Sequence, residues 1–276
     1  MYNRETIAKR AENAQAMYRC CRLCERRCGV NRFAGQRGFC GAGTSARLWR
    51  YGIDYAVEKS LAPSWEIFLS GCDLRCAFCI AEENSVDPLR GQPLTSGLLQ
   101  SITDQAVAEG ARNLQWLGGE PTVHLPAILR TLAETENRLP LVWKSNFYGT
   151  PETWKLLEGL VDYYVADIKY GNDECARRIS LIDRYFETIS RNLLEAGKGD
   201  RLIIRHLLLP GHYECCFRPI VSWIRSRLPK APFSIHIGYF PRWRAKTHAE
   251  LNRPLTTEEV KQARSWAVNK GLNVIE

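Results

Sequence analysis

Three cysteines stand close together in the stretch LSGCDLRCAFCI, residues 69–80, with the spacing C-x₃-C-x₂-C. Three thiolates from one tight loop, here Cys72, Cys76 and Cys79, can hold three irons of a [4Fe–4S] cluster. The fourth iron then has no protein ligand, in the way that catalytic metal sites keep a position open while structural sites are closed. From spacing alone the alternative is a zinc knuckle or plain structural thiols, although zinc usually needs a fourth ligand nearby.

An apolar, β-prone run over residues 65–69 leads into this loop, and Phe78 stands directly before its third cysteine. The pattern C-x₃-C-x-Φ-C, where Φ is aromatic, at the end of a first strand resembles the signature of the radical S-adenosylmethionine superfamily. The resemblance implies that the open iron chelates the amino and carboxylate groups of S-adenosylmethionine. An electron from the cluster then cleaves the sulfonium to methionine and a 5′-deoxyadenosyl radical, which abstracts a hydrogen atom from the substrate. Phe78 could cover the cluster or the adenine.

A second cysteine set precedes this loop, in CRLCERRCGVNRFAGQRGFCGAG. Cys21, Cys24, Cys28 and Cys40 are spaced C-x₂-C-x₃-C-x₁₁-C, and interleaved glycines permit the tight turns that wrap an ion. Four thiolates with no open position predict a closed structural site, with zinc or a second iron–sulfur cluster as the occupant. Four unligated thiols are the alternative. The interleaved arginines offset thiolate charge or bind an anionic partner, and Cys20 is interpreted as a spare thiol.

Residues 1–18 are predicted to form a short helix with Ile7, Ala11 and Ala14 on one side. From residue 65 onward, candidate strands and amphipathic helices alternate; one helix is predicted over 217–228, and the last starts with the capping box Thr256-x-x-Glu259. Several strands are nearly continuous apolar runs, as expected when both faces of a parallel sheet are buried. The predicted strands are Glu66–Ser70, Leu114–Leu117, Leu141–Ser145, Tyr163–Ile168, Leu202–Leu208 and Phe233–Tyr239. Six such units predict an α/β fold, a partial (β/α)₆ TIM-like barrel over 61–276, with a small N-terminal cysteine-rich metal-binding segment over 1–60.

In such barrels the chemistry lies at the carboxyl ends of the strands. The second predicted strand ends in Gly118-Gly119-Glu120-Pro121, where glycines let a ligand approach the backbone. This resembles the GGE motif of the superfamily, whose backbone groups bind the methionine amino group; a plain turn is the alternative. The third strand ends in Ser145-Asn146, which could bond the ribose or carboxylate of the cofactor or form an ordinary turn.

The fourth and fifth predicted strands end in charged residues. Asp167 and Lys169 lie on one side of their strand by alternation, and Arg205 follows two apolar residues on the next strand. This resembles the Asp-x-Lys element and the I-R-x-x-x-x-P-G strand of the glycyl-radical-enzyme activases, which contact S-adenosylmethionine. Arg205 could hold a carboxylate bidentately, whereas His206 should face the other way. A surface salt pair is the alternative for Asp167 and Lys169.

The resemblance to the superfamily covers nearly the whole chain. The radical core matches from about residue 65 to residue 239, and the N-terminal CxxCxxxCGVNRxAGxxGFCG stretch looks like the PflX-type branch, named after pyruvate formate-lyase activating enzyme. Activases usually lack this N-terminal knuckle, so the branch name fits ancestry better than substrate. Cys175, Cys215 and Cys216 lack ligand spacing and are interpreted as plain thiols.

Amino-acid composition bears on the cellular compartment and on possible partners. The odd count of 11 cysteines, clustered at ligand spacing, favours metal and a reducing cytoplasm over disulfides. The amino-terminal stretch has no apolar core of a signal peptide, and no apolar run reaches the ~18–20 residues of a membrane span. The net charge of +8 permits an anionic partner, but without a run of five basic residues a solvated basic surface is the simpler interpretation.

Three functions remain after this reading. The first is a radical enzyme of activase type that takes an electron from a flavodoxin or ferredoxin and removes a hydrogen atom from a protein glycine or another buried position. The second keeps the radical chemistry but acts on a small metabolite or an RNA base. The third is a non-enzymatic module with two zinc knuckles on a barrel scaffold.

Overall fold

The computed structural model describes residues 4–275. The chain divides into two compact units, of which the first comprises residues up to 73 together with 83–163, and the second comprises residues 74–82 together with 164 onward. The predicted helix over residues 1–18 is observed as α1 (Arg4–Ala16), and its first three residues lie outside the described part. The predicted division at residues 60 and 61 stays a prediction.

The first unit contains five strands of a mixed sheet in the order β3-β1-β2-β4-β5. Strand β1 is antiparallel to β2 and to β3, whereas β2, β4 and β5 are parallel. The bounds are β1 (Arg47–Asp54), β2 (Ser64–Leu69), β3 (Gln92–Pro93), β4 (Asn113–Gly118) and β5 (Leu141–Ser145). Leu69 pairs with Gly118, so the ends of β2 and β4 meet at the same edge of the sheet.

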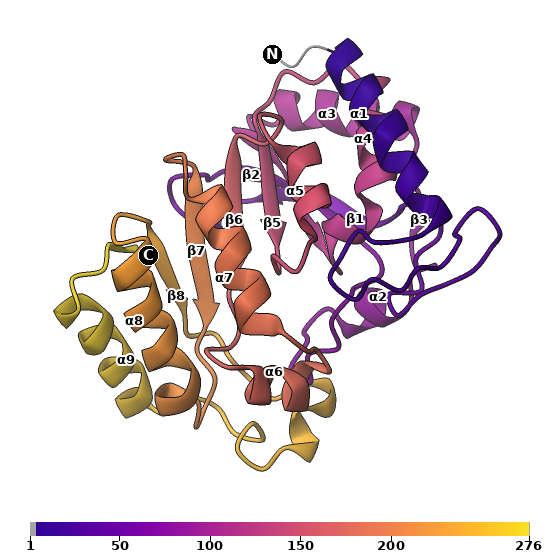
Figure 1. Cartoon of the computed structure of the whole chain (residues 1–276). Helices are drawn as coiled ribbons and strands as arrows, with labels where there is room; N and C mark the ends of the chain where they lie inside the picture. Colours follow the sequence, from indigo (N-terminus) through magenta and orange to yellow (C-terminus); the bar gives the residue numbers. More distant parts are fainter. Residues whose placement is uncertain (1–3, 276) are drawn as a thin grey trace. The chain divides into compact units, whose positions relative to one another are not determined.

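Helices follow the parallel strands of the first unit, as expected for βαβ connections. They are α2 (Glu82–Val86), α3 (Ser96–Ala108), α4 (Leu125–Ala133) and α5 (Pro151–Leu157). Helix α1 lies along α4 (Figure 1) and buries Ile7, Ala11 and Ala14, the stripe predicted from the sequence. The cysteine-rich segment then docks on the loop after β5, where Glu25 N donates to Tyr148 O at 3.0 Å.

The second unit continues with parallel strands in the order β6-β7-β8-β9. Its elements are β6 (Tyr163–Asp167), α6 (Asp173–Ser180), α7 (Tyr185–Ala196), β7 (Leu202–Leu207), the π-helical turn η3 (Tyr213–Phe217), α8 (Arg218–Arg227), β8 (Phe233–His236), α9 (Thr257–Asn269) and β9 (Val274–Ile275). Helix α9 begins with the predicted capping box: Glu259 N donates to Thr256 Oγ1 at 3.1 Å, and Thr256 N donates to Glu259 Oε2 at 2.9 Å.

The α/β class with parallel strands is confirmed, and the observed strands agree with the predicted ones to within one or two residues except β8, which ends at His236 and not at Tyr239. The helix predicted over 217–228 begins as the separate turn η3. Two helices, α2 and α6, were not predicted because each spans only five to eight residues and is rich in polar side chains. Among the described residues, no helix is both long and apolar enough to cross a membrane.

Candidate active site and metal centres

The cysteine loop starts directly after β2, and its first part is held by backbone bonds of the first unit. Gly71 has φ +89°, and its N–H donates to Asn84 O at 2.7 Å. Its carbonyl accepts from Glu120 N at 2.9 Å, which ties the loop to the end of β4. Cys72 follows as a buried thiol, with Sγ 3.9 Å from Asp73 Oδ1. The first predicted cluster ligand therefore stands on a fixed backbone.

Gly118 and Gly119 at the end of β4 are required by close packing of the chain on itself. A Cβ on Gly118, which has φ +85°, would lie 2.4 Å from Leu69 N, and one on Gly119 would lie 2.0 Å from Gly71 O. No side chain fits at either position without moving backbone. These glycines therefore let the cysteine loop pack closely against β4, a role that was not predicted from the sequence. Their predicted contact with the cofactor stays a prediction.

Glu120 is wholly buried and serves as an acceptor for its neighbours. Its carboxylate accepts from Thr122 N at 3.0 Å, Ser145 Oγ at 2.8 Å and Asn146 N at 2.9 Å. Burial, with the nearby Asp73 carboxylate as a further cause, raises the pKa of Glu120 to about 7. The side chains of Glu120 and Ser145 thus join the ends of β4 and β5, and their predicted role in binding cofactor stays a prediction.

Asp73 links the cysteine loop to the cysteine-rich N-terminal segment. Its Oδ1 accepts from Asn146 Nδ2 at 2.7 Å, its backbone carbonyl accepts from Arg26 Nε at 2.8 Å, and its Oδ2 is buried without a hydrogen-bond partner. Burial raises the pKa of this carboxyl. Sequence reasoning did not select Asp73, although it directly follows Cys72. Asn146 also accepts from Tyr148 N at 2.9 Å, so its amide has protein partners on both atoms.

The remainder of the cysteine loop belongs to the second unit and is held by the end of α6. Arg75 N donates to Ser180 O at 3.1 Å, and Ala77 N donates to Ile179 O at 2.8 Å. Cys76 is buried, whereas Cys79 is half-buried. These two backbone hydrogen bonds hold the chain on both sides of Cys76, the second predicted cluster ligand.

Phe78 is buried, in accord with a covering role. Its ring stands edge-on to Tyr170 at 6.4 Å and to Tyr239 at 6.3 Å between centroids. The Tyr170 hydroxyl in turn bonds to Ser180 Oγ at the end of α6. The aromatic rings and α6 therefore form one packed support under the loop residues of this unit.

The charged residues predicted at the ends of β6 and β7 do come together. Lys169 Nζ lies 3.5 Å from Asp167 Oδ2, and Arg205 Nε lies 3.3 Å from Asp167 Oδ1. All three side chains are 20–30% exposed, so two cations flank one carboxylate in a partly solvated position. His206 faces the opposite way, as predicted, and its Nδ1 bonds to Ile168 O at 2.8 Å. Charged groups of both signs therefore meet at the ends of β6 and β7.

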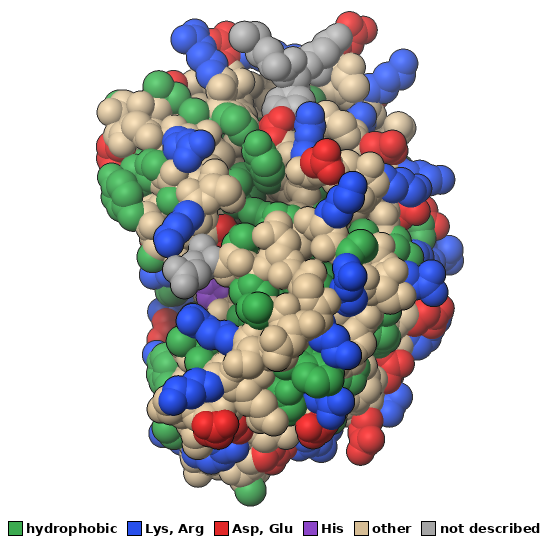
Figure 2. Space-filling model, turned by 90° about the vertical axis from the view of Figure 1, so that its left-hand side faces the viewer, with side chains coloured by type: hydrophobic (Ala, Val, Ile, Leu, Met, Phe, Trp, Pro, Cys, Tyr) green, Lys and Arg blue, Asp and Glu red, His purple; other side chains and the backbone are tan. Residues whose placement is uncertain are grey.

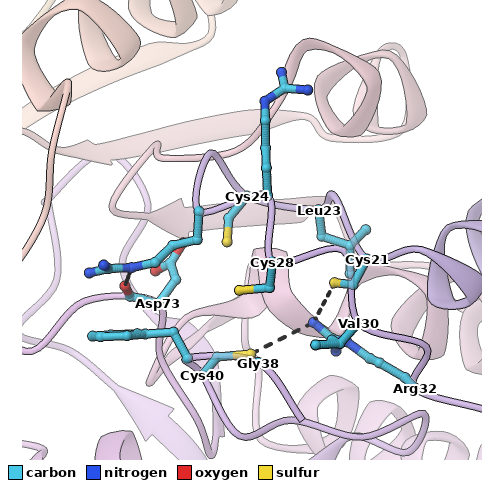
Figure 3. Close-up of a pocket in the computed structure, with 12 residues that line it drawn as sticks. Cys21, Leu23, Cys24, Cys28, Val30, Arg32, Gly38, Cys40 and Asp73 are labelled. Carbon is cyan, nitrogen blue, oxygen red and sulfur yellow. Dashed lines mark hydrogen bonds between the residues drawn. The ribbon is translucent and has the colours of Figure 1, made fainter. Parts of the chain in front are cut away.

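The four N-terminal cysteines line a common hollow in the first unit (Figure 3). Figure 3 shows the sulfurs of Cys21, Cys24, Cys28 and Cys40 directed toward one another across this hollow, with Asp73 on its wall. Tight turns bring them together, because Gly29 N donates to Cys21 O at 3.0 Å. The predicted ligand set is therefore assembled by the fold.

Arg32 is the buried cation of this hollow and was not singled out among the arginines of the sequence. Its guanidinium donates to Cys21 Sγ at 3.1 Å and to Cys40 Sγ at 3.7 Å, and also to Val123 O at 2.8 Å. Burial alone would lower the pKa of Arg32, but the Cys40 and Cys21 thiolates raise it above its ordinary value. A buried guanidinium thus contacts two of the four sulfurs of this hollow.

Another cysteine group was missed. Cys175, His212, Cys215 and Cys216 place their ligand atoms within 4.8 Å of one another, and they are the one such group of three or more His, Cys, Asp or Glu in residues 4–275. The interpretation of these cysteines as plain thiols rested on their spacing in the sequence, whereas α6 and η3 bring together residues that are 40 positions apart. The available signal was the compact string H-x₂-C-C, which sequence reasoning did not weigh with Cys175.

On the face drawn in Figure 2, positively charged side chains are not concentrated in one patch. Lys and Arg side chains are spread over that face and interspersed with Asp and Glu. The net charge of +8 is thus displayed there as a dispersed basic surface, in line with the simpler interpretation of the sequence.

An α/β fold with parallel strands and a three-cysteine loop after β2 is consistent with a partial TIM-like barrel. A family model described as the Radical SAM superfamily matches residues 67–224, more than half of the 276 residues. The chain belongs to this superfamily. Membership implies a [4Fe–4S] cluster and S-adenosylmethionine as cofactors, and it supports an enzyme. The Methanocaldococcus jannaschii protein described as uncharacterized protein MJ0674 is 36% identical over 272 residues, covering 96% of this chain and 79% of that protein.

Two solved structures share the fold at low identity. SuiB of Streptococcus suis, bound to precursor peptide SuiA, has a TM-score of 0.55 and 14% identity; 74% of this chain and 46% of SuiB are covered. This chain thus spans less than half the length of SuiB. A radical SAM methyltransferase from Sphaerobacter thermophilus has a TM-score of 0.52 and 15% identity, with 86% and 70% coverage. The likeness supports the predicted partial TIM-like barrel.

Proposed function

We propose that this protein is a radical oxidoreductase of activating-enzyme type that removes a hydrogen atom from a protein substrate. The observation that carries the proposal is the C-x₃-C-x₂-C loop placed directly after β2 in a chain of the radical SAM superfamily. None of the 11 cysteines, all of which lie in the described part of the chain, is in a disulfide. The donor set of Cys72, Cys76 and Cys79 fits a cubane with one open iron.

Cys72, Cys76 and Cys79 would hold a [4Fe–4S] cluster, which would supply the electron for reductive cleavage of S-adenosylmethionine and so the radical chemistry that removes a hydrogen atom. The chain's own residues then orient the cofactor. Lys169 and Arg205 offer positive charge for its carboxylate, with Asp167 between them as the anion that keeps both cations in place. Phe78, packed on two tyrosines, excludes water from its side of the loop.

The residues at the ends of β4 and β5 take a positioning role in this proposal. The Glu120 carboxylate accepts hydrogen bonds from Ser145 Oγ and from Asn146 N. The Asn146 side chain donates to the Asp73 carboxylate. These hydrogen bonds therefore fix the loop that carries Cys72. Gly118 and Gly119 let that loop pack against the end of β4.

For the N-terminal cysteines we favour a second iron–sulfur cluster over zinc. One tetrahedral zinc ion with metal–sulfur bonds of about 2.3 Å holds its sulfurs about 3.8 Å apart. Within the described part of the chain, the N-terminal sulfurs do not all lie within 4.8 Å of one another, unlike the ligand atoms of the Cys175 group. A cubane, which gives each thiolate its own iron, needs this wider spacing.

The proposal of a protein substrate rests on the activase-like residues Asp167, Lys169 and Arg205. It is also supported by the fold likeness to SuiB, whose structure was solved with a bound precursor peptide. A flavodoxin or ferredoxin is the proposed reductant, and the disulfide-free cysteine content suits the reducing cytoplasm. A small metabolite or an RNA base as substrate is the second candidate. RNA retention that falls steeply with salt would favour that candidate over a protein.

The test is anaerobic reconstitution with iron and sulfide, reduction with dithionite or reduced flavodoxin, and assay for 5′-deoxyadenosine. Wild-type protein should form it, whereas Cys72→Ala should not. Cys20→Ser is the matched control, because Cys20 is exposed and outside both predicted ligand sets. Reconstituted wild-type protein that lacks both cluster absorbance and cleavage would falsify the proposal and leave the zinc-module interpretation.

A further inference from the structure

The group formed by Cys175, His212, Cys215 and Cys216 has the dimensions of a single tetrahedral ion. Its sulfurs are 3.8 Å apart between Cys175 and Cys215 and 3.9 Å apart between Cys215 and Cys216. His212 Nδ1 lies 3.6, 3.3 and 3.7 Å from the three sulfurs in chain order. A zinc ion with bonds of about 2.3 Å to sulfur and about 2.0–2.1 Å to nitrogen needs sulfurs about 3.8 Å apart and nitrogen about 3.6 Å from each.

The backbone is shaped to hold this group. Phe217 N donates to His212 O at 3.1 Å, an i to i+5 bond that makes η3 a π-helical turn and turns the adjacent cysteines toward the histidine. A Cβ on Gly171 would lie 2.4 Å from Cys216 O, so only glycine lets the loop before α6 approach η3 this closely. Such turns are common at functional sites.

Asn172 completes the cradle from the N-cap of α6. Its Oδ1 accepts from Cys175 N at 2.8 Å, and its Nδ2 donates to Cys215 O at 2.7 Å. The same Nδ2 lies 3.4 Å from Cys175 Sγ and 3.7 Å from Cys216 Sγ. One amide thus ties both segments together and places its Nδ2 beside two sulfurs.

The far side of the histidine carries a carboxylate. His212 Nε2 is buried without a hydrogen-bond partner, and Glu250 Oε1 is 3.8 Å away, held there by Arg178. Metal-binding histidines usually direct their second ring nitrogen to a carboxylate, which fixes the tautomer. Arg178 also lies beside Cys175 and offsets the excess negative charge of three thiolates around a dication.

We propose that Cys175, His212, Cys215 and Cys216 form a closed structural zinc site. The ion joins the start of α6 to η3. Because Ser180 O and Ile179 O at the other end of α6 accept from Arg75 N and Ala77 N, the ion also steadies the loop around Cys76. This last consequence rests on the proposed function, whereas the zinc site itself does not.

The experiment measures zinc and iron per chain in full-length protein purified anaerobically without added metal. Cys216→Ser and Cys175→Ser should each lose about one zinc ion per chain and keep their iron, while Cys20→Ser keeps both metals. X-ray absorption at the zinc edge should show sulfur and nitrogen neighbours in a ratio of about three to one. Unchanged zinc in the variants, or loss of iron in place of zinc, would overturn the proposal.

Two further measurements do not depend on how well the cysteine variants fold. Cobalt added to zinc-depleted wild-type protein should give the intense sulfur-to-metal absorption of a tetrahedral thiolate site, and its absence contradicts the proposal. Glu250→Gln should weaken zinc about 10-fold in a competition with chelator, through loss of the carboxylate behind His212. Zinc bound in Cys72→Ala, which has no cleavage activity, separates this site from the proposed reaction.

Discussion

The cysteines of the N-terminal hollow and those of the Cys175 group differ in how closely their sulfurs approach. Within the described residues, the sulfurs of the first set do not all lie within 4.8 Å of one another, whereas Cys215 Sγ lies 3.8 Å from Cys175 Sγ and 3.9 Å from Cys216 Sγ. Since a single ion draws all its ligands to one centre and a cubane spreads them over four irons, the spacing indicates the size of the group that each site holds. Cysteine count alone does not distinguish the two.

The two regions also balance their charge differently. The N-terminal hollow holds the buried guanidinium of Arg32 and the buried carboxyl of Asp73. The Cys175 group uses the neutral amide of Asn172 and the partly exposed pair of Arg178 and Glu250. Buried charge is costly unless it is compensated, so the first region should depend strongly on its occupant and its arginine. The second should tolerate changes in its surroundings better.

The largest loss of activity should come from replacing a cysteine of the C-x₃-C-x₂-C loop. This change should leave the N-terminal hollow and the Cys175 group intact. Cys76→Ser should lower 5′-deoxyadenosine formation at least roughly 100-fold and remove about four iron atoms per chain, because the cubane loses one of only three ligands. Zinc content should not change. The measurement is product by chromatography and metal by mass spectrometry. A variant that keeps wild-type cleavage would show that Cys76 is no ligand.

The next prediction addresses the hollow directly. Cys28→Ser should cost about four iron atoms per chain, roughly half of the total, while zinc stays bound. Cys28 is exposed, so its replacement disturbs packing less than that of the buried Cys21 or Cys24. Iron and zinc analysis beside Cys20→Ser provides the check. Loss of zinc in place of iron would break the argument from sulfur spacing.

Much of the fold could be predicted from the sequence because its signals are local. Apolar runs such as β2 and β5 are buried on both faces, and the capping box of α9 needs only Thr256 and Glu259. The two cysteine sets spaced along short loops were found for the same reason. The pairing of Asp167 with Lys169 followed from strand alternation.

What could not be predicted depends on contacts between distant segments. Cys175 meets Cys215 only because Gly171 allows the loop before α6 to approach η3. Gly119 appeared as a ligand-binding glycine, yet a Cβ there would strike Gly71 O, which becomes its neighbour only when β2 and β4 pair. Burial of Glu120 among internal donors likewise requires the sheet to be formed.

The free energy of unfolding tests whether buried charge matters more in the N-terminal hollow than in the Cys175 group. Arg32→Gln removes a buried guanidinium from two thiolates and from Val123 O, and should cost about 3–5 kcal/mol of unfolding free energy. Arg178→Gln removes a cation whose side chain is 44% exposed and should cost less than about 1 kcal/mol. Anaerobic chemical denaturation of both variants gives the comparison. Equal costs would mean that buried charge does not distinguish the regions.

The smallest effect is a pH dependence of the first unit. Burial raises the pKa of Glu120 from 4.5 to about 7 in the folded protein, so the folded state binds this proton more tightly than the unfolded chain. The resulting stability is complete below pH 4.5 and is lost as pH rises through 7; the full change is on the order of 3 kcal/mol. Glu120→Gln cannot ionise and should flatten this window.

The Glu120→Gln variant also loses an acceptor for the N–H groups of Thr122 and Asn146, so it should be less stable than wild type at every pH. Because the wild-type protein loses stability above pH 5 and the variant does not, the gap between them should narrow as pH rises from 5 to 8. Glu158→Gln, at an exposed position, serves as the control with the wild-type profile. A constant gap would show that Glu120 is ionised throughout, held by its three donors more strongly than burial opposes it.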